Sequence, residues 1–178
     1  MFYAINGLAG RSEVIDEAML VLARPSSLLV PGALLFGYWL WVNWREAFMG
    51  ATAMAGLVAL GDLLGALIKQ AVQRARPCQV LDQVHELVGC GGTFSFPSNH
   101  ALNTATAAAF AQVLYPATGW VSWPLVALVG LSRVYIGGHY VTDVLGGWVI
   151  GGLIGGGAAV VLIRWPVFRK GRGCQAMG

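Results

Sequence analysis

Five apolar stretches of membrane-spanning length constrain the fold of this chain more than any other feature. They cover residues 28–44, 48–69, 98–115, 119–136 and 140–165. The hydrocarbon core of a bilayer is about 30 Å thick, and a helix of roughly 20 apolar residues crosses it. Within lipid, a helix satisfies its own backbone hydrogen bonds. The sequence therefore predicts an all-α, polytopic membrane helix bundle that forms a single domain over residues 1–178.

The composition supports a membrane location and argues against soluble classes. Hydrophobic residues make up 57% of the chain and charged residues only 11%, whereas soluble domains carry about 25% charged residues. The net charge is +3, and the basic residues are scattered rather than clustered. Because a nucleic-acid-binding surface requires a basic patch, we expect the bilayer, and no nucleic acid, as a partner of this chain. The sequence leaves the oligomeric state open.

Residues 12–24 (SEVIDEAMLVLAR) differ from the five apolar stretches because they mix acidic and apolar residues at helical spacing. Ser12 is a candidate N-cap, and acidic residues fill the first turn that follows it. The apolar side chains of this segment are Val14, Ile15, Ala18, Met19 and Leu22. The pattern predicts an amphipathic helix within residues 1–25 that lies in the membrane interface. An irregular first span over the same residues is the alternative, and it would raise the number of crossings from five to six.

The distribution of Lys and Arg predicts the orientation in the membrane. If five spans alternate, residues 45–47 and 166–178 share one face, and residues 70–97 lie on the other. The first face carries one acid, Glu46, and five bases, namely Arg45, Arg164, Arg169, Lys170 and Arg172. The opposite face carries six bases, but its acids nearly cancel them. Cytoplasmic segments are enriched in Lys and Arg, so we predict a cytoplasmic tail at 166–178 and an extracytoplasmic loop region at 70–97.

The cysteines bear on the same loop region. Cys78 and Cys90 lie in it, twelve residues apart, whereas Cys174 lies in the tail. In an oxidising compartment the first two could form a disulfide that contributes about 3 kcal/mol. Two free thiols are the alternative at this stage. No spacing of Cys and His residues is typical of a zinc site, so no metal ligand is predicted.

Polar residues gather at those ends of the apolar stretches that face outward. Lys69 ends the second stretch, Arg76 follows it within KQAVQRARP, and Arg133 ends the fourth. The third stretch opens with Ser98, Asn99 and His100, where the unpaired N–H groups of a helix N-terminus attract anions. Guanidinium groups match phosphate oxygens bidentately, and lysine adds a point charge. The sequence predicts a phosphate-binding site formed by Lys69, Arg76, Ser98, Asn99 and Arg133.

Two of the three histidines have a predicted catalytic role. His139 and Asp143 are spaced i, i+4, so on a helix they share a face, and the carboxylate can accept one ring N–H while the other nitrogen stays free to attack. His100 comes from a different stretch, from which it could protonate a leaving oxygen and later deprotonate water. The third histidine, His85, has no such neighbours, and we expect it to be an ordinary loop residue.

These residues together resemble a known family. Residues 69–77 fit K-x6-R-P, residues 97–100 fit P-S-G-H with Asn99 in place of glycine, and residues 132–143 fit S-R-x5-H-x3-D. The chain is similar in these motifs to the type 2 phosphatidic acid phosphatase superfamily. The resemblance implies a metal-independent phosphatase without cofactor that passes through a phosphohistidine at His139. It implies His100 as general acid and base and Asp143 as the group that orients the nucleophile, with the phosphate-binding residues named above gripping the phosphate.

The resemblance also suggests substrates. The short chain and the run from Trp123 to Gly147 are similar to bacterial undecaprenyl-diphosphate phosphatases of this superfamily, which implies a lipid phosphate substrate at the extracytoplasmic face of the cell membrane. Undecaprenyl diphosphate is the first expectation, and phosphatidylglycerophosphate and lipid A are alternatives. A catalytically silent lipid-binding scaffold is the alternative from another class. The side chain of Asn99 leaves substrate preference open.

Two further features have structural interpretations. Asp62 precedes Lys69 by seven residues, about 10 Å along a helix, and we expect it to position Lys69 or to hydrogen-bond Asn103 or Thr104 rather than to act in catalysis. Gly147, Gly151 and Gly155 recur at a spacing of four. Small residues at this spacing are typical of closely packed membrane helices.

Overall fold

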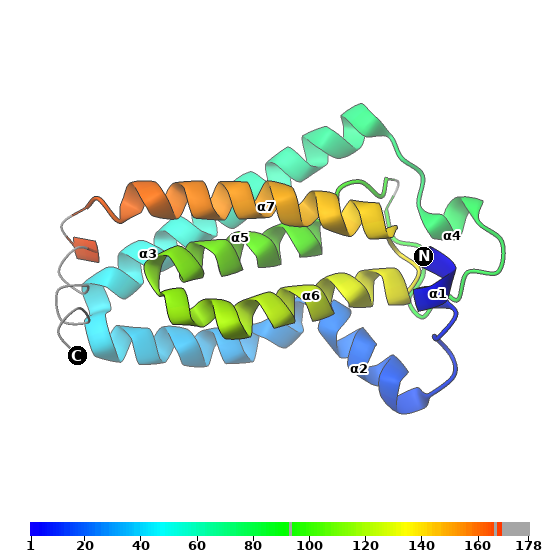
Figure 1. Ribbon diagram of the computed structural model, residues 1–178, viewed down its shortest axis with the longest axis horizontal. Coiled ribbons are helices and arrows are strands. Elements are labelled where there is room, and N and C mark those ends of the chain that lie inside the picture. Colours follow the sequence, from blue (N-terminus) through cyan, green and yellow to red (C-terminus); the bar gives the residue numbers. More distant parts are fainter. Residues whose placement is uncertain (93, 166, 169–178) are drawn as a thin grey trace.

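The computed structural model describes residues 1–92, 94–165 and 167–168 and is built from helices (Figure 1). The main ones are α3 (Leu29–Val72), α5 (Asn99–Leu114), α6 (Gly119–Tyr135) and α7 (Val141–Leu162). Shorter ones are α1 (Phe2–Asn6), α2 (Glu13–Ala23), η1 (Pro25–Leu28), α4 (Pro77–Val80) and η2 (Pro116–Thr118). The predicted all-α class is confirmed, and α5, α6 and α7 agree with the third to fifth apolar stretches within three residues at each end. The predicted tail, apart from Val167 and Phe168, lies outside the described residues.

The first two apolar stretches form the two arms of α3, which turns back on itself at Asn43 (Figure 1). Asn43 has a non-helical backbone, with φ −155° and ψ 87°. Its Oδ1 accepts a hydrogen bond from the backbone N–H of Glu46 at 3.3 Å, and its Nδ2 donates to Glu46 Oε2 at 2.9 Å. Asn43 therefore acts as the N-cap of the second arm, since its side-chain oxygen accepts from the backbone N–H three residues further on.

Two helical segments in the described part of the chain are long and apolar enough to cross a membrane, Gly32–Val72 and Val141–Leu162. The first contains most of both arms of α3. With 16 and 17 residues, α5 and α6 are somewhat shorter than a helix that spans the full hydrocarbon core. The number of five or six crossings stays a prediction.

The glycines of α7 bring it into close contact with α5, which lies between α6 and α7 (Figure 1). A Cβ atom at Gly151 would lie 2.1 Å from Leu102 O, and one at Gly155 would lie 2.0 Å from Thr106 O. At Gly147 the distance to Ser98 O would be 2.7 Å. Side chains larger than hydrogen do not fit at these distances, so the predicted close helix packing is confirmed.

The N-terminal helices α1 and α2 lie at the end of the bundle where α6 ends and α7 begins (Figure 1). Ser12 occupies the N-cap position of α2, as predicted, and its side chain makes no capping hydrogen bond. The 11 residues of α2 rise about 16 Å, roughly half of a hydrocarbon core. This length and the exposed side chains of Val14 and Ile15 favour an interfacial helix over a sixth span.

Residues 73–92 and 94–98 fold over the same end of the bundle. A disulfide joins Cys78 and Cys90, whose Cα atoms are 5.9 Å apart. Ala75 and Phe94 pair in an isolated antiparallel β-bridge. His85 lies in this loop, where its backbone N–H donates to Asn6 Oδ1 at 2.9 Å and its carbonyl accepts from Asn6 Nδ2 at 2.9 Å. The loop is therefore fastened both to itself and to α1.

Candidate active site

His139 lies at the centre of the site, in the turn between α6 and α7. Its side chain is only 3% exposed. The ring Nδ1 hydrogen-bonds the carbonyl of Ser95 at 2.8 Å. A carbonyl can only accept, so Nδ1 carries the proton and Nε2 presents its lone pair. Arg76 Nη1 lies 3.4 Å from this Nε2, which places a guanidinium beside the free nitrogen.

Asp143 is fully buried but has different partners from those predicted. Tyr140 is the N-cap of α7, so His139 precedes the helix and the pair does not share a helical face. The carboxylate accepts from the backbone N–H of Tyr140 at 2.8 Å and from Arg74 Nη1 at 2.8 Å. Its Oδ2 is 3.7 Å from His139 Nδ1, longer than a hydrogen bond. The predicted Asp143–His139 hydrogen bond is therefore replaced by the one to the Ser95 carbonyl, and Asp143 acts on His139 through its charge.

Arg74 is a site residue that the sequence motifs did not reveal. Its guanidinium pairs with Asp143, donates to Thr142 Oγ1 at 2.6 Å and stacks 4.1 Å from the ring centroid of Tyr140. The signal for it was the pair Arg74 and Arg76. Two residues apart in an extended segment, they point to the same side of the backbone.

Arg76 and Arg133 converge on the turn that holds His139. Arg76 Nη1 donates to Gly138 O at 3.0 Å, and Arg133 Nη1 donates to Ala23 O, at the end of α2, at 3.1 Å. A Cβ atom at Gly138 would lie 3.8 Å from both Arg76 Nη1 and Arg133 Nη2. Two guanidinium groups therefore face the same small volume beside the histidine.

Ser98 and His100 enter the site from the N-terminus of α5. Ser98 is the N-cap of this helix and is fully buried. The charged and titratable groups around His100 include Lys69, Arg133 and His139, which puts the second imidazole on the same side as the first. Seven buried side-chain polar atoms have no hydrogen-bond partner among the described residues, and four of them belong to predicted site residues: Arg76 Nε, Ser98 Oγ, His100 Nε2 and Arg133 Nε.

Lys69 and Asn99 lie against each other at the edge of the site. Lys69 Nζ donates to the carbonyl of Pro97 and to Asn99 Oδ1. The other end of the Asn99 amide binds Asp62, since its Nδ2 donates to Asp62 Oδ1 at 3.0 Å. Asp62 therefore has a structural partner in α5, as expected. Asn103 is its second partner, at 2.9 Å, whereas Thr104 bonds the carbonyl of His100 instead.

The surroundings of His139 keep its imidazole neutral. Burial lowers the pKa of His139 below its usual value of 6.5, and the positive charges of Arg76 and Arg133 lower it further, while Asp143 acts in the opposite direction. A neutral ring with an unprotonated Nε2 is the form that can attack an electrophile. Both imidazoles, three cations and a helix N-terminus therefore meet at one end of the bundle, and all eight predicted site residues lie there.

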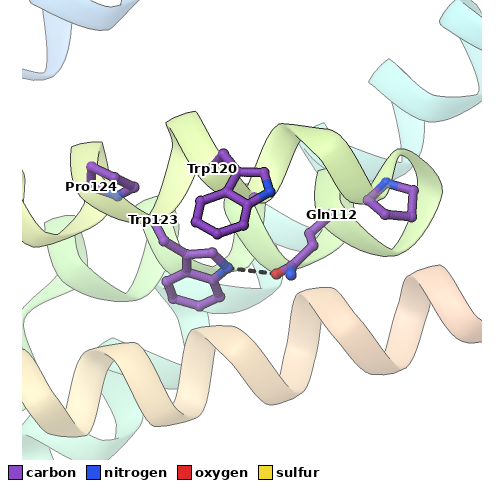
Figure 2. A pocket seen from close by; sticks show the side chains of 6 residues that line it. Gln112, Trp120, Trp123 and Pro124 are labelled. Carbon is purple, nitrogen blue, oxygen red and sulfur yellow. Dashed lines mark hydrogen bonds between the residues drawn. The ribbon is translucent and has the colours of Figure 1, made fainter.

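A pocket of about 460 Å³ lies near the other end of α5 and the start of α6. It is lined by Gln112, Pro116, Gly119, Trp120, Trp123 and Pro124, and Figure 2 shows the hydrogen bond from Trp123 Nε1 to Gln112 Oε1, 2.6 Å long. None of these six side chains is ionisable. The pocket therefore offers no acid, base or nucleophile, and the histidine site is the candidate for chemistry.

A helical membrane protein with this cluster of cations and imidazoles belongs to the class of hydrolases that act on phosphate esters. The sequence profile of the PAP2 superfamily matches residues 50–168. The chain belongs to this superfamily, and it is a phosphatase of that family.

Individual relatives extend over most of the chain. Undecaprenyl-diphosphatase BcrC of Bacillus subtilis is 32% identical, with 87% of this chain and 79% of that protein covered. A lipid A 4'-phosphatase of Porphyromonas gingivalis is 28% identical over 87% of this chain and 68% of its own length. The crystal structure of a transmembrane PAP2-type phosphatidylglycerolphosphate phosphatase from Bacillus subtilis superimposes with a TM-score of 0.70 at 27% identity, covering 92% of this chain and 85% of that one.

Proposed function

We propose that this protein releases phosphate by hydrolysis of a lipid phosphate or diphosphate, and that its preferred substrate is undecaprenyl diphosphate. The observation that carries the proposal is that four of the buried polar atoms without a hydrogen-bond partner among the described residues belong to residues of this site, namely Arg76, Ser98, His100 and Arg133. Buried polar atoms are almost always hydrogen-bonded. A phosphoryl group has the acceptor oxygens to satisfy the donors among them. The similarity to undecaprenyl-diphosphatase BcrC supports the choice of lipid.

The proposed reaction has two steps. First, His139 Nε2 attacks phosphorus, the bond between phosphorus and the leaving oxygen breaks, and His100 protonates that oxygen. For undecaprenyl diphosphate the leaving group is undecaprenyl phosphate. Second, His100 takes a proton from water, whose oxygen attacks the phosphohistidine. Inorganic phosphate leaves, and His139 regains its lone pair.

The cations have an electrostatic role in both steps. Lys69, Arg76 and Arg133 neutralise the charge of the phosphoryl oxygens, and the N-terminus of α5 adds backbone N–H groups. The Ser95 carbonyl holds the tautomer of His139, while Asp143 stabilises the positive charge that its ring acquires as the bond forms. No metal ion takes part in this mechanism.

The lipid would reach the site from the extracytoplasmic leaflet. The disulfide of the loop over the site suits an oxidising compartment, in agreement with the orientation predicted from Lys and Arg. The helix α2 ends at Ala23, whose carbonyl binds Arg133. Its exposed apolar side chains, among them Val14 at 79% exposure, suit immersion between headgroups. A headgroup could therefore enter the site while its tail stays in lipid.

The test is phosphate release by the purified protein in a chelator. Undecaprenyl diphosphate, phosphatidylglycerophosphate and lipid A are compared, because relatives act on each kind of lipid. We expect turnover that vanadate inhibits, fastest on undecaprenyl diphosphate. His139→Ala should abolish it, whereas His85→Ala, which removes a histidine outside the site, should retain it. Turnover by His139→Ala would refute the nucleophile, and a wild-type protein that is silent on all three lipids would favour the binding scaffold.

A further inference from the structure

A line of polar side chains runs from Asp62, in the second arm of α3, to Lys69. Asn99 is its middle member, since it donates to Asp62 Oδ1 at 3.0 Å and accepts from Lys69 Nζ. We infer that Asn99 is a positioning residue through which Asp62 holds the ammonium of Lys69 at the phosphate site. This inference rests on the proposed function of that site. It assigns the side chain of Asn99 to Lys69 rather than to the phosphate itself.

The surface of α3 is shaped to receive this amide. A Cβ atom at Gly65 would lie 2.8 Å from Asn99 Oδ1 and 3.3 Å from its Cγ. One turn earlier, a Cβ atom at Gly61 would lie 2.6 Å from Leu102 Cδ2 and 3.0 Å from Asn103 Oδ1. The space that α3 leaves by having glycine at both positions is filled by side chains of α5. Asn99 is therefore seated between the helices, with one end of its amide toward each partner.

Lys69 needs such a partner because of its position. Its four-carbon stem is flexible, and the neighbouring guanidinium of Arg76 repels its charge. Asp62 does not bind it directly: the two residues lie about 10 Å apart along the helix, and no ion pair joins them among the described residues. Asn99 spans this gap. An ammonium has three N–H donors, of which Pro97 O and Asn99 Oδ1 accept one each, so one donor remains for a phosphate oxygen.

The chain contains a matched control for this role. Asn103 donates to the same oxygen of Asp62 at 2.9 Å, from one turn further along α5. Its own Oδ1 has no hydrogen-bond partner in the part of the chain that the structure describes. Asn103 and Asn99 therefore bind the same carboxylate, but of the two only Asn99 also accepts a hydrogen bond from Lys69.

Lysine NMR tests the inference without a substrate. The sequence has two lysines, Lys69 and Lys170, so Lys170→Arg leaves one side-chain signal in protein labelled with ¹³C and ¹⁵N lysine. We expect Asn99→Ala and Asp62→Asn to shift the Lys69 resonance, and Asn103→Ala to leave it in place. Asn99→Gly, which places the family's own residue here, serves if the alanine variant does not fold. An unmoved resonance in the Asn99 and Asp62 variants, or an equal shift in Asn103→Ala, would overturn the inference.

Kinetics supply the second reading. Loss of a charged hydrogen-bond partner at Lys69 should weaken vanadate inhibition and lower kcat/KM by about tenfold or more in Asn99→Ala. Adding Asp62→Asn to that variant should cause no further loss, because Asp62 acts through Asn99. Independent, multiplying losses would overturn the inference. If the Asn99 and Asp62 variants show the resonance shifts but the wild-type protein releases no phosphate from any lipid, the proposed function is refuted and the positioning arrangement still stands.

Discussion

Replacing Gly151 by alanine tests whether the contact between α5 and α7 sets the geometry of the site. The new Cβ would lie 2.1 Å from Leu102 O, whereas non-bonded heavy atoms rest about 3.5 Å apart, so the helices must separate by roughly 1 Å. Overpacking of this kind costs about 1–3 kcal/mol, and alanine regains about 1 kcal/mol of helix propensity. Gly152 is the control, because a Cβ there meets no atom within 4 Å. The two variants should therefore differ by the whole overpacking cost.

Thermal unfolding in detergent and phosphate release measure the two consequences. For a chain of this size the difference corresponds to a Tm about 2–12 °C lower for Gly151→Ala than for Gly152→Ala. The separation also moves His100, on α5, away from the start of α7, where His139 and Asp143 lie. A misplacement of about 1 Å costs roughly 100-fold in rate, so we expect a loss of that order in kcat for Gly151→Ala alone. Equal Tm and equal kcat in the two variants would refute the reasoning.

Two further predictions concern the pH profile and the loop. Because the pKa of His139 lies below 6.5, kcat/KM should fall with decreasing pH only below that value. Arg74→Gln removes the positive charge that pairs with Asp143, so the pKa of His139 should rise and this acid limb should move to higher pH. An unmoved limb would contradict the role of Arg74. Cys78→Ala should lower the free energy of unfolding by about 3 kcal/mol under oxidising conditions, measured by thermal unfolding. Reductant should destabilise only the wild type, and equal sensitivity of both proteins to reductant would count against the disulfide.

The sequence predicted the helices well because lipid reduces the choice of structure. An apolar run bounded by turn residues and charges has to be a helix of nearly the same length, and α5, α6 and α7 follow their runs closely. The break at Asn43 was harder to place, because the apolar stretches were read as ending at residue 44 and resuming at 48. The signal was local, namely an asparagine three residues before Glu46, whose backbone N–H it caps.

The site was predictable as a set of residues but not as a set of hydrogen bonds. The spacing of the motifs was enough to identify the eight residues, which the fold places at one end of the bundle. The partners of His139 and Asp143 depend on backbone conformation outside the helices, which the i, i+4 argument assumed to be helical. The carbonyl of Ser95 belongs to the long loop, and no property of a serine in the sequence shows where its carbonyl points.

The hydrogen bonds around the site explain how it would favour an anion, as we propose. Each of the four groups that can carry positive charge beside the proposed phosphate position donates to a backbone carbonyl: Lys69 to Pro97, Arg76 to Gly138, Arg133 to Ala23 and His139 to Ser95. A carbonyl fixes a donor in place without cancelling its charge. Among the described residues, no carboxylate lies within 4 Å of the side-chain nitrogens of Lys69, Arg76 or Arg133, while Arg74 takes up Asp143. The three cations are therefore rigidly held and not neutralised by the protein, which is the arrangement that a phosphoryl group can complete.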